Sequence, residues 1–238
     1  MKKLITILAR KGSKGLPDKN IKLMNGQPLI YWTFFQAINY DEGVDIVVST
    51  NYDGMKHFCN THGVYHHDRD LNLAQDDTPK LDAIRDAVTA AETEYGKTYD
   101  TIIDLDVSAP LRTEINIHEA IGMHDMMNER STLDVLFSIS PARKNPYFNM
   151  VTTDQFGQSK TTCEGNYLRR QDAPPIHEMN ASIYIYNKKW LDKGINNVLN
   201  SRNYPLYMED WQAFDIDSEV DFQIAEMLHK KYILDKGE

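Results

Sequence analysis

Short apolar segments alternate with amphipathic segments along most of the chain. The apolar runs are rich in β-branched residues and have the short length of buried strands. The segments between them carry apolar side chains three and four positions apart, which gives a helix one apolar face. The predicted strands are residues 4–8, 44–50, 64–67, 101–107, 135–140 and 181–187, and the predicted helices are residues 28–38, 51–62, 80–95, 114–127 and 218–234. This alternation predicts an α/β fold with helices on both faces of a mainly parallel sheet.

The pattern breaks between residues 141 and 175, which are polar and show no sustained period. This segment contains Gly157, Gly165 and the pair Pro174-Pro175, all of which favour turns. We therefore expect one domain over residues 1–238, with residues 141–175 forming an excursion such as a hairpin or an oligomerisation arm. Residues 211–217 are expected to form a last strand or a loop.

A basic, glycine-containing loop follows the first predicted strand. Gly12 and Gly15 allow backbone amides to approach an anion closely, and Arg10, Lys14 and Lys19 bring three cations within ten positions. The carboxyl end of a first strand is also where open α/β sheets bind ligands. The loop therefore indicates a polyphosphate site, although it matches neither the GxGxxG nor the GxxxxGK[ST] pattern.

Two pairs of aspartates are candidate magnesium sites. Asp215 and Asp217 lie at positions i and i+2, which face the same side of an extended segment and can share one cation. The alternative is that one of them caps the last helix, for which Ser218 is also a candidate N-cap, while the other is solvated. Asp104 and Asp106 lie at the end of an apolar strand, where carboxylates are costly unless they are hydrated, paired or bound to a metal.

Composition narrows the class of protein. A net charge of −9 disfavours general binding of nucleic acid through phosphates. No apolar run approaches the roughly 18 residues of a membrane span, and the short apolar run after two lysines indicates a strand and not a signal peptide. Cys59 and Cys163 make no disulfide framework, so a cytoplasmic location is the default expectation.

Five ordered motifs together resemble one family, the acylneuraminate cytidylyltransferases, which make CMP-sialic acid and related CMP-nonulosonates. The first motif is LARKGSKGLPDKN followed by IKLMNGQPLI. DRDLNLAQDDTP is similar to the family's RPxxLAxDxT, and SAPLR is similar to its TSPLR. MNASIYIYN is similar to its NGAIYI strand, and FDIDSEVDFQIAE is similar to its DIDxxxDxxxAE ending. The resemblance implies a Rossmann-like nucleotidyltransferase fold with a small dimerisation subdomain, and hence a homodimer.

The resemblance also implies a reaction and the residues that perform it. A nonulosonic acid would attack the α-phosphorus of CTP and release pyrophosphate, with Mg²⁺ assisting. The implied catalytic residues are Arg10, Lys14, Lys19, Asp215 and Asp217, the last two as magnesium ligands. The implied nucleotide-binding residues are Ala9, Arg10, Gly12, Ser13, Lys19, Asn20 and Arg69. We therefore expect cations near the start of the chain and carboxylates near its end to converge on one triphosphate.

The resemblance implies fewer of the residues that contact the acceptor sugar. Asp106, Arg170 and Tyr184 match sugar-contacting positions, with Arg170 or its neighbour Arg169 reaching the site of the other subunit. Arg170 can instead be an interface ion pair, and Tyr184 an ordinary strand aromatic. The chain departs from the family where DLDVSAPLR replaces LLQPTSPLR, which puts Asp106 at the position of a glutamine.

A second departure follows DDTP, where Lys80 and Leu81 replace small hydroxyl residues. The departures leave the identity of the sugar open between N-acetylneuraminate and legionaminate-type acids. A 3-deoxy-manno-octulosonate cytidylyltransferase is the near alternative. A non-catalytic nucleotide-binding regulator is the alternative from another class.

Overall fold

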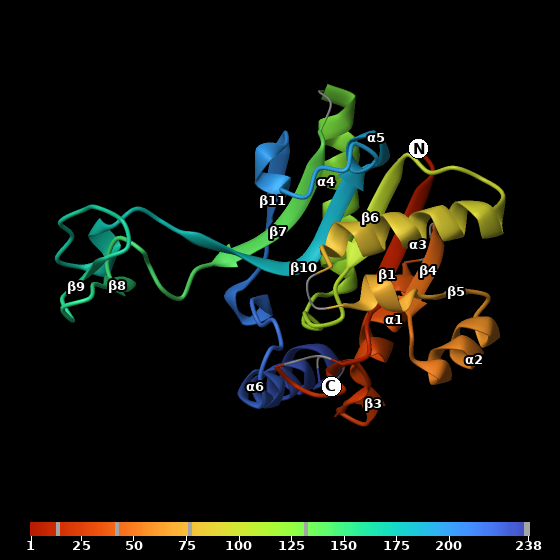
Figure 1. Ribbon diagram of the computed structural model, residues 1–238, viewed down its shortest axis with the longest axis horizontal. Helices are drawn as coiled ribbons and strands as arrows, with labels where there is room; N and C mark the ends of the chain where they lie inside the picture. The colour runs from red at the N-terminus through yellow and green to blue at the C-terminus, as the bar shows by residue number, and fades with distance from the viewer. Residues whose placement is uncertain (13–14, 41–42, 76–77, 131–132, 236–238) are drawn as a thin grey trace.

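A computed structural model describes residues 1–12, 15–40, 43–75, 78–130 and 133–235 (Figure 1). Its centre is a seven-stranded sheet in the order β11-β7-β10-β6-β1-β4-β5. The strands are β1 (Lys3–Ala9), β4 (Asp45–Thr50), β5 (Tyr65–Asp68), β6 (Thr101–Leu105), β7 (Val135–Pro141), β10 (His177–Asn187) and β11 (Asn203–Tyr207). All pairs are parallel except those of β10, which is antiparallel to both β6 and β7. The prediction of a mainly parallel sheet is confirmed.

Helices cover both faces of the sheet, as Figure 1 shows. They are α1 (Leu29–Asn39), α2 (Asp53–Thr61), α3 (Lys80–Tyr95), α4 (Glu114–Arg130), α5 (Lys188–Leu191) and α6 (Glu219–His229). Successive strand residues point to opposite faces. Accordingly, Ile102 packs in the core that contains α3, and Ile103 packs in the core that contains α1 and α4. The predicted alternation of strands and helices therefore produces two buried apolar layers.

The excursion projects from the body of the molecule (Figure 1). It contains a two-stranded antiparallel sheet of β8 (Val151–Thr153) and β9 (Ser159–Thr161), followed by a 3-10 turn at Arg170–Asp172. The chain leaves the sheet at the end of β7 and returns along β10. Because it returns from the same end of the sheet, β10 runs antiparallel to its neighbours. The structure therefore contains the predicted hairpin, while its role in oligomerisation stays a prediction.

Some elements differ from the sequence prediction. The edge strand β11 was not predicted, because its sequence NYPLY contains a proline, which is tolerated on an edge strand. Residues 211–217 were expected to form a strand or a loop, and they form a loop that begins with the 3-10 turn Asp210–Gln212. The last helix ends at His229 and continues as a π-helical turn, Lys230–Leu234. A short hairpin of β2 (Leu23–Met24) and β3 (Gln27–Pro28) precedes α1.

The N-cap of α6 is as predicted. Ser218 accepts a hydrogen bond from the Asp221 amide, and the Asp221 carboxylate accepts one from the Ser218 amide, which makes a capping box. Neither Asp215 nor Asp217 caps the helix, so these carboxylates remain available for another role. Within the described part of the chain, no helix combines the length and the apolar character that crossing a membrane requires.

Candidate active site

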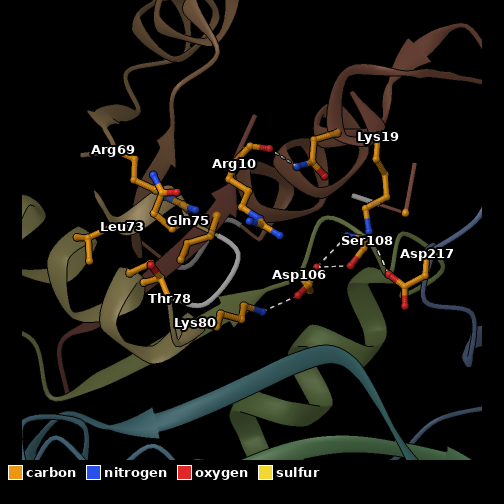
Figure 2. Close-up of a pocket in the computed structure, with 14 residues that line it drawn as sticks. Arg10, Lys19, Arg69, Leu73, Gln75, Thr78, Lys80, Asp106, Ser108 and Asp217 are labelled. Carbon is orange, nitrogen blue, oxygen red and sulfur yellow. Dashed lines mark hydrogen bonds and ion pairs between the residues drawn. The ribbon is translucent and has the colours of Figure 1, made fainter. Parts of the chain in front are cut away.

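A polar cavity of about 430 Å³ lies at the carboxyl ends of the parallel strands (Figure 2). This is the edge where open α/β sheets bind ligands. The lining residues come from the basic loop, the segment before α3, the loop after β6 and the segment before α6. They are Leu8, Arg10, Gly15, Lys19, Asn20, Arg69, Leu73, Gln75, Thr78, Lys80, Ala83, Asp106, Ser108 and Asp217.

Residues from the two ends of the chain meet at this cavity. The Lys19 ammonium donates a hydrogen bond to the carbonyl of Ile216 and lies 3.5 Å from the carboxylate of Asp217. The Gly15 backbone packs directly on the same segment, since a Cβ atom added there would lie 2.2 Å from the Asp217 carbonyl oxygen. Only glycine fits such a contact. The expected convergence of Lys19 with Asp217 is therefore present.

Backbone conformation and side-chain contacts shape the basic loop. Gly12 has φ +87°, a conformation that favours glycine. The Asn20 side-chain amide donates to the Arg10 carbonyl at 3.0 Å, which ties the end of the loop to its beginning. Ala9 is buried at the end of β1, next to Thr50 of β4. Ser13 and Lys14 lie outside the described residues.

Arg69 is buried at the wall of the cavity. Its guanidinium donates to the Ser49 hydroxyl at 3.1 Å and to the Ser49 carbonyl at 2.9 Å. Burial lowers the pKa of Arg69 to about 10, so the group stays charged at neutral pH. The Ser49 contacts hold one edge of the guanidinium, and the residue lines the cavity.

The two acidic residues before α6 have different surroundings. Asp217 is 80% exposed and lines the cavity. Asp215 is half-buried, and its Oδ1 is a buried atom without a hydrogen-bond partner in the structure. Burial and the nearby charge of Asp106 raise the pKa of Asp215 above its ordinary value. Between them, the Ile216 amide donates to the Ser108 carbonyl at 2.9 Å, which attaches this segment to the loop after β6.

The second aspartate pair is already engaged by a side chain. The Lys80 ammonium lies 2.7 Å from Asp104 Oδ2 and 2.5 Å from Asp106 Oδ2. Asp106 Oδ1 accepts hydrogen bonds from the Ser108 amide at 2.8 Å and from its hydroxyl at 2.7 Å. Burial alone would raise the pKa of Asp106, but Lys80 and Ser108 hold it below its ordinary value. The ammonium of Lys80 therefore takes the position between the carboxylates that a metal ion would otherwise occupy.

Arg112, the arginine of the SAPLR motif, is fully buried. Its guanidinium donates to the carbonyls of Asp106 and Ala109 at 2.7 and 2.8 Å and to the Thr33 hydroxyl at 2.6 Å. These contacts fix the loop that carries Asp106 and Ser108. The motif therefore has a structural role that its sequence alone did not indicate.

The residues predicted on the sugar side are divided between two places. Tyr184 in β10 lies opposite Asp104 of β6, and the Lys80 ammonium is 5.8 Å from the centre of its ring. Arg170 lies on the excursion, where it donates to the Ala142 carbonyl at 2.8 Å and lines a separate cavity of about 500 Å³. Arg169 pairs with Asp172. Neither arginine is among the residues lining the cavity of its own chain in Figure 2.

Comparison with known proteins agrees with this geometry. The family model described as "Cytidylyltransferase" matches residues 4–238. The chain belongs to the cytidylyltransferase family. It is 39% identical over 227 residues to a CMP-N,N'-diacetyllegionaminic acid synthase of Campylobacter jejuni, covering 94% of each chain. It is 37% identical over 230 residues to the post-translational flagellin modification protein B of Campylobacter coli, covering 96% of this chain and 95% of that protein.

More distant relatives and solved structures show which fold the chain has. An N-acylneuraminate cytidylyltransferase of Streptococcus agalactiae is 30% identical over 226 residues, which are 93% of this chain and 52% of that protein. A CMP:2-keto-3-deoxy-manno-octonic acid synthetase complexed with CTP superposes with a TM-score of 0.67 at 15% identity, covering 98% of this chain and 100% of that one. A 4-diphosphocytidyl-2C-methyl-D-erythritol synthase of Anaerococcus prevotii gives a TM-score of 0.65 at 11% identity, covering 95% and 97%. The prediction of a nucleotidyltransferase fold is confirmed.

Several lining residues of this cytidylyltransferase were not assigned from its sequence. Gln75 and Thr78 line the cavity within the DRDLNLAQDDTP motif, and Ser108 lines it within SAPLR. The motifs marked the correct segments, but not which side chains face inward. Lys80 was noted only as a departure from the family pattern, because its partners Asp104 and Asp106 lie at the end of β6, far from α3 in the sequence.

Proposed function

We propose that this cytidylyltransferase transfers CMP from CTP to the anomeric hydroxyl of a nonulosonic acid and releases pyrophosphate. The observation that carries the proposal is the convergence of Lys19 with Asp217 at one cavity. The anomeric oxygen would form a bond to the α-phosphorus while the bond from that phosphorus to the pyrophosphate oxygen breaks. Negative charge grows on the phosphoryl and leaving oxygens, where Arg10 and Lys19 can stabilise it.

A divalent cation, Mg²⁺, is proposed at Asp215 and Asp217. The unpartnered buried oxygen of Asp215 and the exposed carboxylate of Asp217 suit a cation whose remaining ligands are phosphate oxygens and water. Among the described residues, no group of three or more His, Cys, Asp or Glu side chains is arranged to hold a metal ion. When bound, Mg²⁺ would neutralise phosphate charge and lower the pKa of the attacking hydroxyl.

The acceptor is proposed to be a legionaminic acid derivative, with sialic acid as the second candidate. The relatives named for diacetyllegionaminate and for N-acylneuraminate support this order by their identities of 39% and 30%. Asp106 and Tyr184 are proposed to contact the acceptor sugar. Arg170 is proposed to reach the site of the other subunit of a homodimer, because it lies on the excursion and not at the cavity of its own chain. A cytoplasmic location remains a prediction, and free Cys59 and Cys163 are compatible with it.

The proposal is tested by incubating purified protein with CTP, MgCl₂ and a panel of nonulosonic acids, and measuring pyrophosphate release and the CMP-sugar product. We expect release with at least one nonulosonate and its loss in Asp217→Asn. Activity with 3-deoxy-manno-octulosonate alone would favour the near alternative. CTP binding without release, unchanged by Asp215→Ala and Asp217→Ala, would favour the non-catalytic regulator. No release with any acceptor from a folded sample would refute the proposal.

A further inference from the structure

The cavity presents an ammonium group that the proposed transfer step does not use. Lys80 is the first residue of α3, and its side chain extends to the end of β6. The side chain keeps 40% of its surface exposed and lines the cavity beside Asp106, as Figure 2 shows. Burial alone would lower the pKa of Lys80, but the carboxylates of Asp104 and Asp106 raise it well above its ordinary value. A bound ligand therefore meets a permanently charged group at a fixed position.

Lys80 has a hydrogen-bond donor to spare, and most of the acceptor capacity of Asp106 is already used. An ammonium carries three donors, and the ion pairs with Asp104 and Asp106 engage two of them at most. Asp106 Oδ1 already accepts from Ser108, and its Oδ2 pairs with Lys80. The Lys80 ammonium therefore offers a ligand one free donor, next to the single acceptor site left on Asp106 Oδ2.

The charge of the surroundings indicates which ligand atom this donor suits. Lys80 and the buried Arg112 supply two positive charges, and Asp104 and Asp106 supply two negative charges. Arg69 interacts electrostatically with Asp104, and Asp215 with Asp106, which adds one charge of each sign, so the cluster is formally neutral. A neutral cluster has no net attraction for an anion such as a phosphate. It suits an uncharged acceptor, such as a hydroxyl or the carbonyl oxygen of an N-acyl group.

The position of the cluster relates it to the acceptor sugar. The Lys80 ammonium contacts Asp106 and lies 5.8 Å from the ring centre of Tyr184, the two residues proposed on the sugar side in this chain. The phosphate-side residues Arg10 and Lys19 come from the other wall of the cavity (Figure 2). We propose that Lys80 is a specificity-determining residue that donates a hydrogen bond to an uncharged oxygen of the acceptor sugar, with Asp104 and Asp106 orienting its ammonium.

This inference rests on the proposed function and explains the two departures from the family pattern together. Lys80 and Asp106 each depart from the resemblance, and the structure brings them into direct contact. A site built to hydrogen-bond one substrate group rejects analogues that lack it, because the protein group is then left unpaired. Lys80 should therefore affect the choice among nonulosonates that differ in their N-acyl and hydroxyl groups.

The test compares wild type, Lys80→Met and the double variant Lys80→Met/Asp104→Asn. The double variant removes one charge of each sign, so it does not leave Asp104 buried without its counter-ion. Each protein is assayed with CTP, MgCl₂ and the nonulosonate panel, and CTP affinity is measured separately. We expect kcat/KM for the preferred sugar to fall about 10- to 100-fold, the usual effect of losing a charged hydrogen bond, while the Kd for CTP changes less than about threefold. The differences in kcat/KM between the sugars should also become smaller.

Lys97→Met is the matched control. Lys97 forms an ion pair of 2.5 Å with Asp45 at a similar exposure of 37%, but it does not line this cavity. It should leave kcat/KM and the ranking unchanged. A folded double variant whose sugar kcat/KM falls less than about fivefold, or whose loss lies only in CTP affinity, would overturn the role of Lys80. If wild type itself releases no pyrophosphate with any sugar, the proposed function fails first, and the inference fails with it.

Discussion

Lys19 and Asp217, from opposite ends of the chain, lie with Nζ and Oδ1 3.5 Å apart at the cavity. The Lys19 side chain is only 10% exposed, whereas that of Asp217 is 80% exposed. Lys19 also holds the carbonyl of Ile216, so it joins the basic loop to the acidic segment before any ligand binds. The two halves of the proposed triphosphate site are therefore preorganised by a direct contact.

Replacing Lys19 tests this contact. Lys19→Met removes the cation that we propose to stabilise the leaving phosphates, and we expect kcat for pyrophosphate release to fall roughly 10²- to 10³-fold. The control is Lys22→Met, because Lys22 lies in the same segment and pairs with Glu219 but does not line the cavity. Steady-state kinetics at saturating CTP should show only a small effect in the control. Equal losses in both variants would contradict a specific role for Lys19.

Gly15→Ala tests the close approach of the two chain ends. The added Cβ would lie 2.2 Å from the Asp217 carbonyl oxygen, so the acidic segment must move away. We expect a loss of roughly 10- to 100-fold in kcat/KM, because small displacements of catalytic groups are costly. Gly122→Ala is the control, since nothing lies within 4 Å of the added atom in α4, and it should raise stability by about 0.5–1 kcal/mol. Unchanged activity of Gly15→Ala would show that the loop adapts freely.

Asp215→Asn is expected to trade activity for stability. Burial and Asp106 raise the folded-state pKa of Asp215, so the ionised form is disfavoured in the folded protein. Asp215 therefore stabilises the folded protein at pH values below the pKa that it has in the unfolded chain. This stabilisation is lost as the pH rises through the higher pKa that Asp215 has in the folded protein. The asparagine variant should melt at a higher temperature than wild type at pH 7 without metal, while kcat falls roughly 10²-fold or more. A lower Tm at pH 7 would contradict this explanation.

The same raised pKa predicts the acidic limb of the activity profile. Protons compete with Mg²⁺ for the carboxylate of Asp215, so the Mg²⁺ concentration needed for half-maximal activity should increase as pH falls toward its pKa. Magnesium titrations at several pH values measure this dependence. A half-maximal concentration that stays constant over the acidic range would exclude Asp215 as a ligand.

Arg112 is expected to matter for stability more than any surface arginine. Arg112→Met leaves the carbonyls of Asp106 and Ala109 without their donor and removes a buried positive charge beside two carboxylates. We expect a loss of about 3–5 kcal/mol in the free energy of unfolding. Arg202→Met, which removes a solvent-exposed guanidinium from its pair with Asp134, should cost far less than Arg112→Met. Urea denaturation of both variants measures the difference.

Mixing two inactive variants tests the proposed role of Arg170 across a dimer. If Arg170 acts in the partner's site, a mixed dimer of Arg170→Ala and Lys19→Met has one intact site. Co-refolded mixtures should then recover up to about a quarter of wild-type activity, since half of the dimers are mixed. Each variant alone serves as the control. No recovery, or a purely monomeric protein in sedimentation, would remove the role of Arg170 across subunits.

The sequence alone determined most of the order of strands and helices and the segments that line the cavity. The periods of apolar residues are local properties, so they predicted α3 over residues 80–95 with its observed bounds. Motif order was sufficient to mark the basic loop and the acidic segment. It also identified Ser218 as the N-cap of α6, because capping depends on residues within one turn.

Tertiary structure decided which of these residues meet and what each one contacts. Lys80 and Asp106 were separate anomalies in the sequence, and only the packing of α3 against β6 makes them one ion pair. The edge strand β11 was missed because its sequence NYPLY contains a proline and because its place in the sheet depends on β7, a partner distant in the sequence. Local patterns specify backbone conformation, whereas contacts between distant segments depend on how the whole chain packs. For that reason the sequence predicted the components of the site, and the fold determined their pairing.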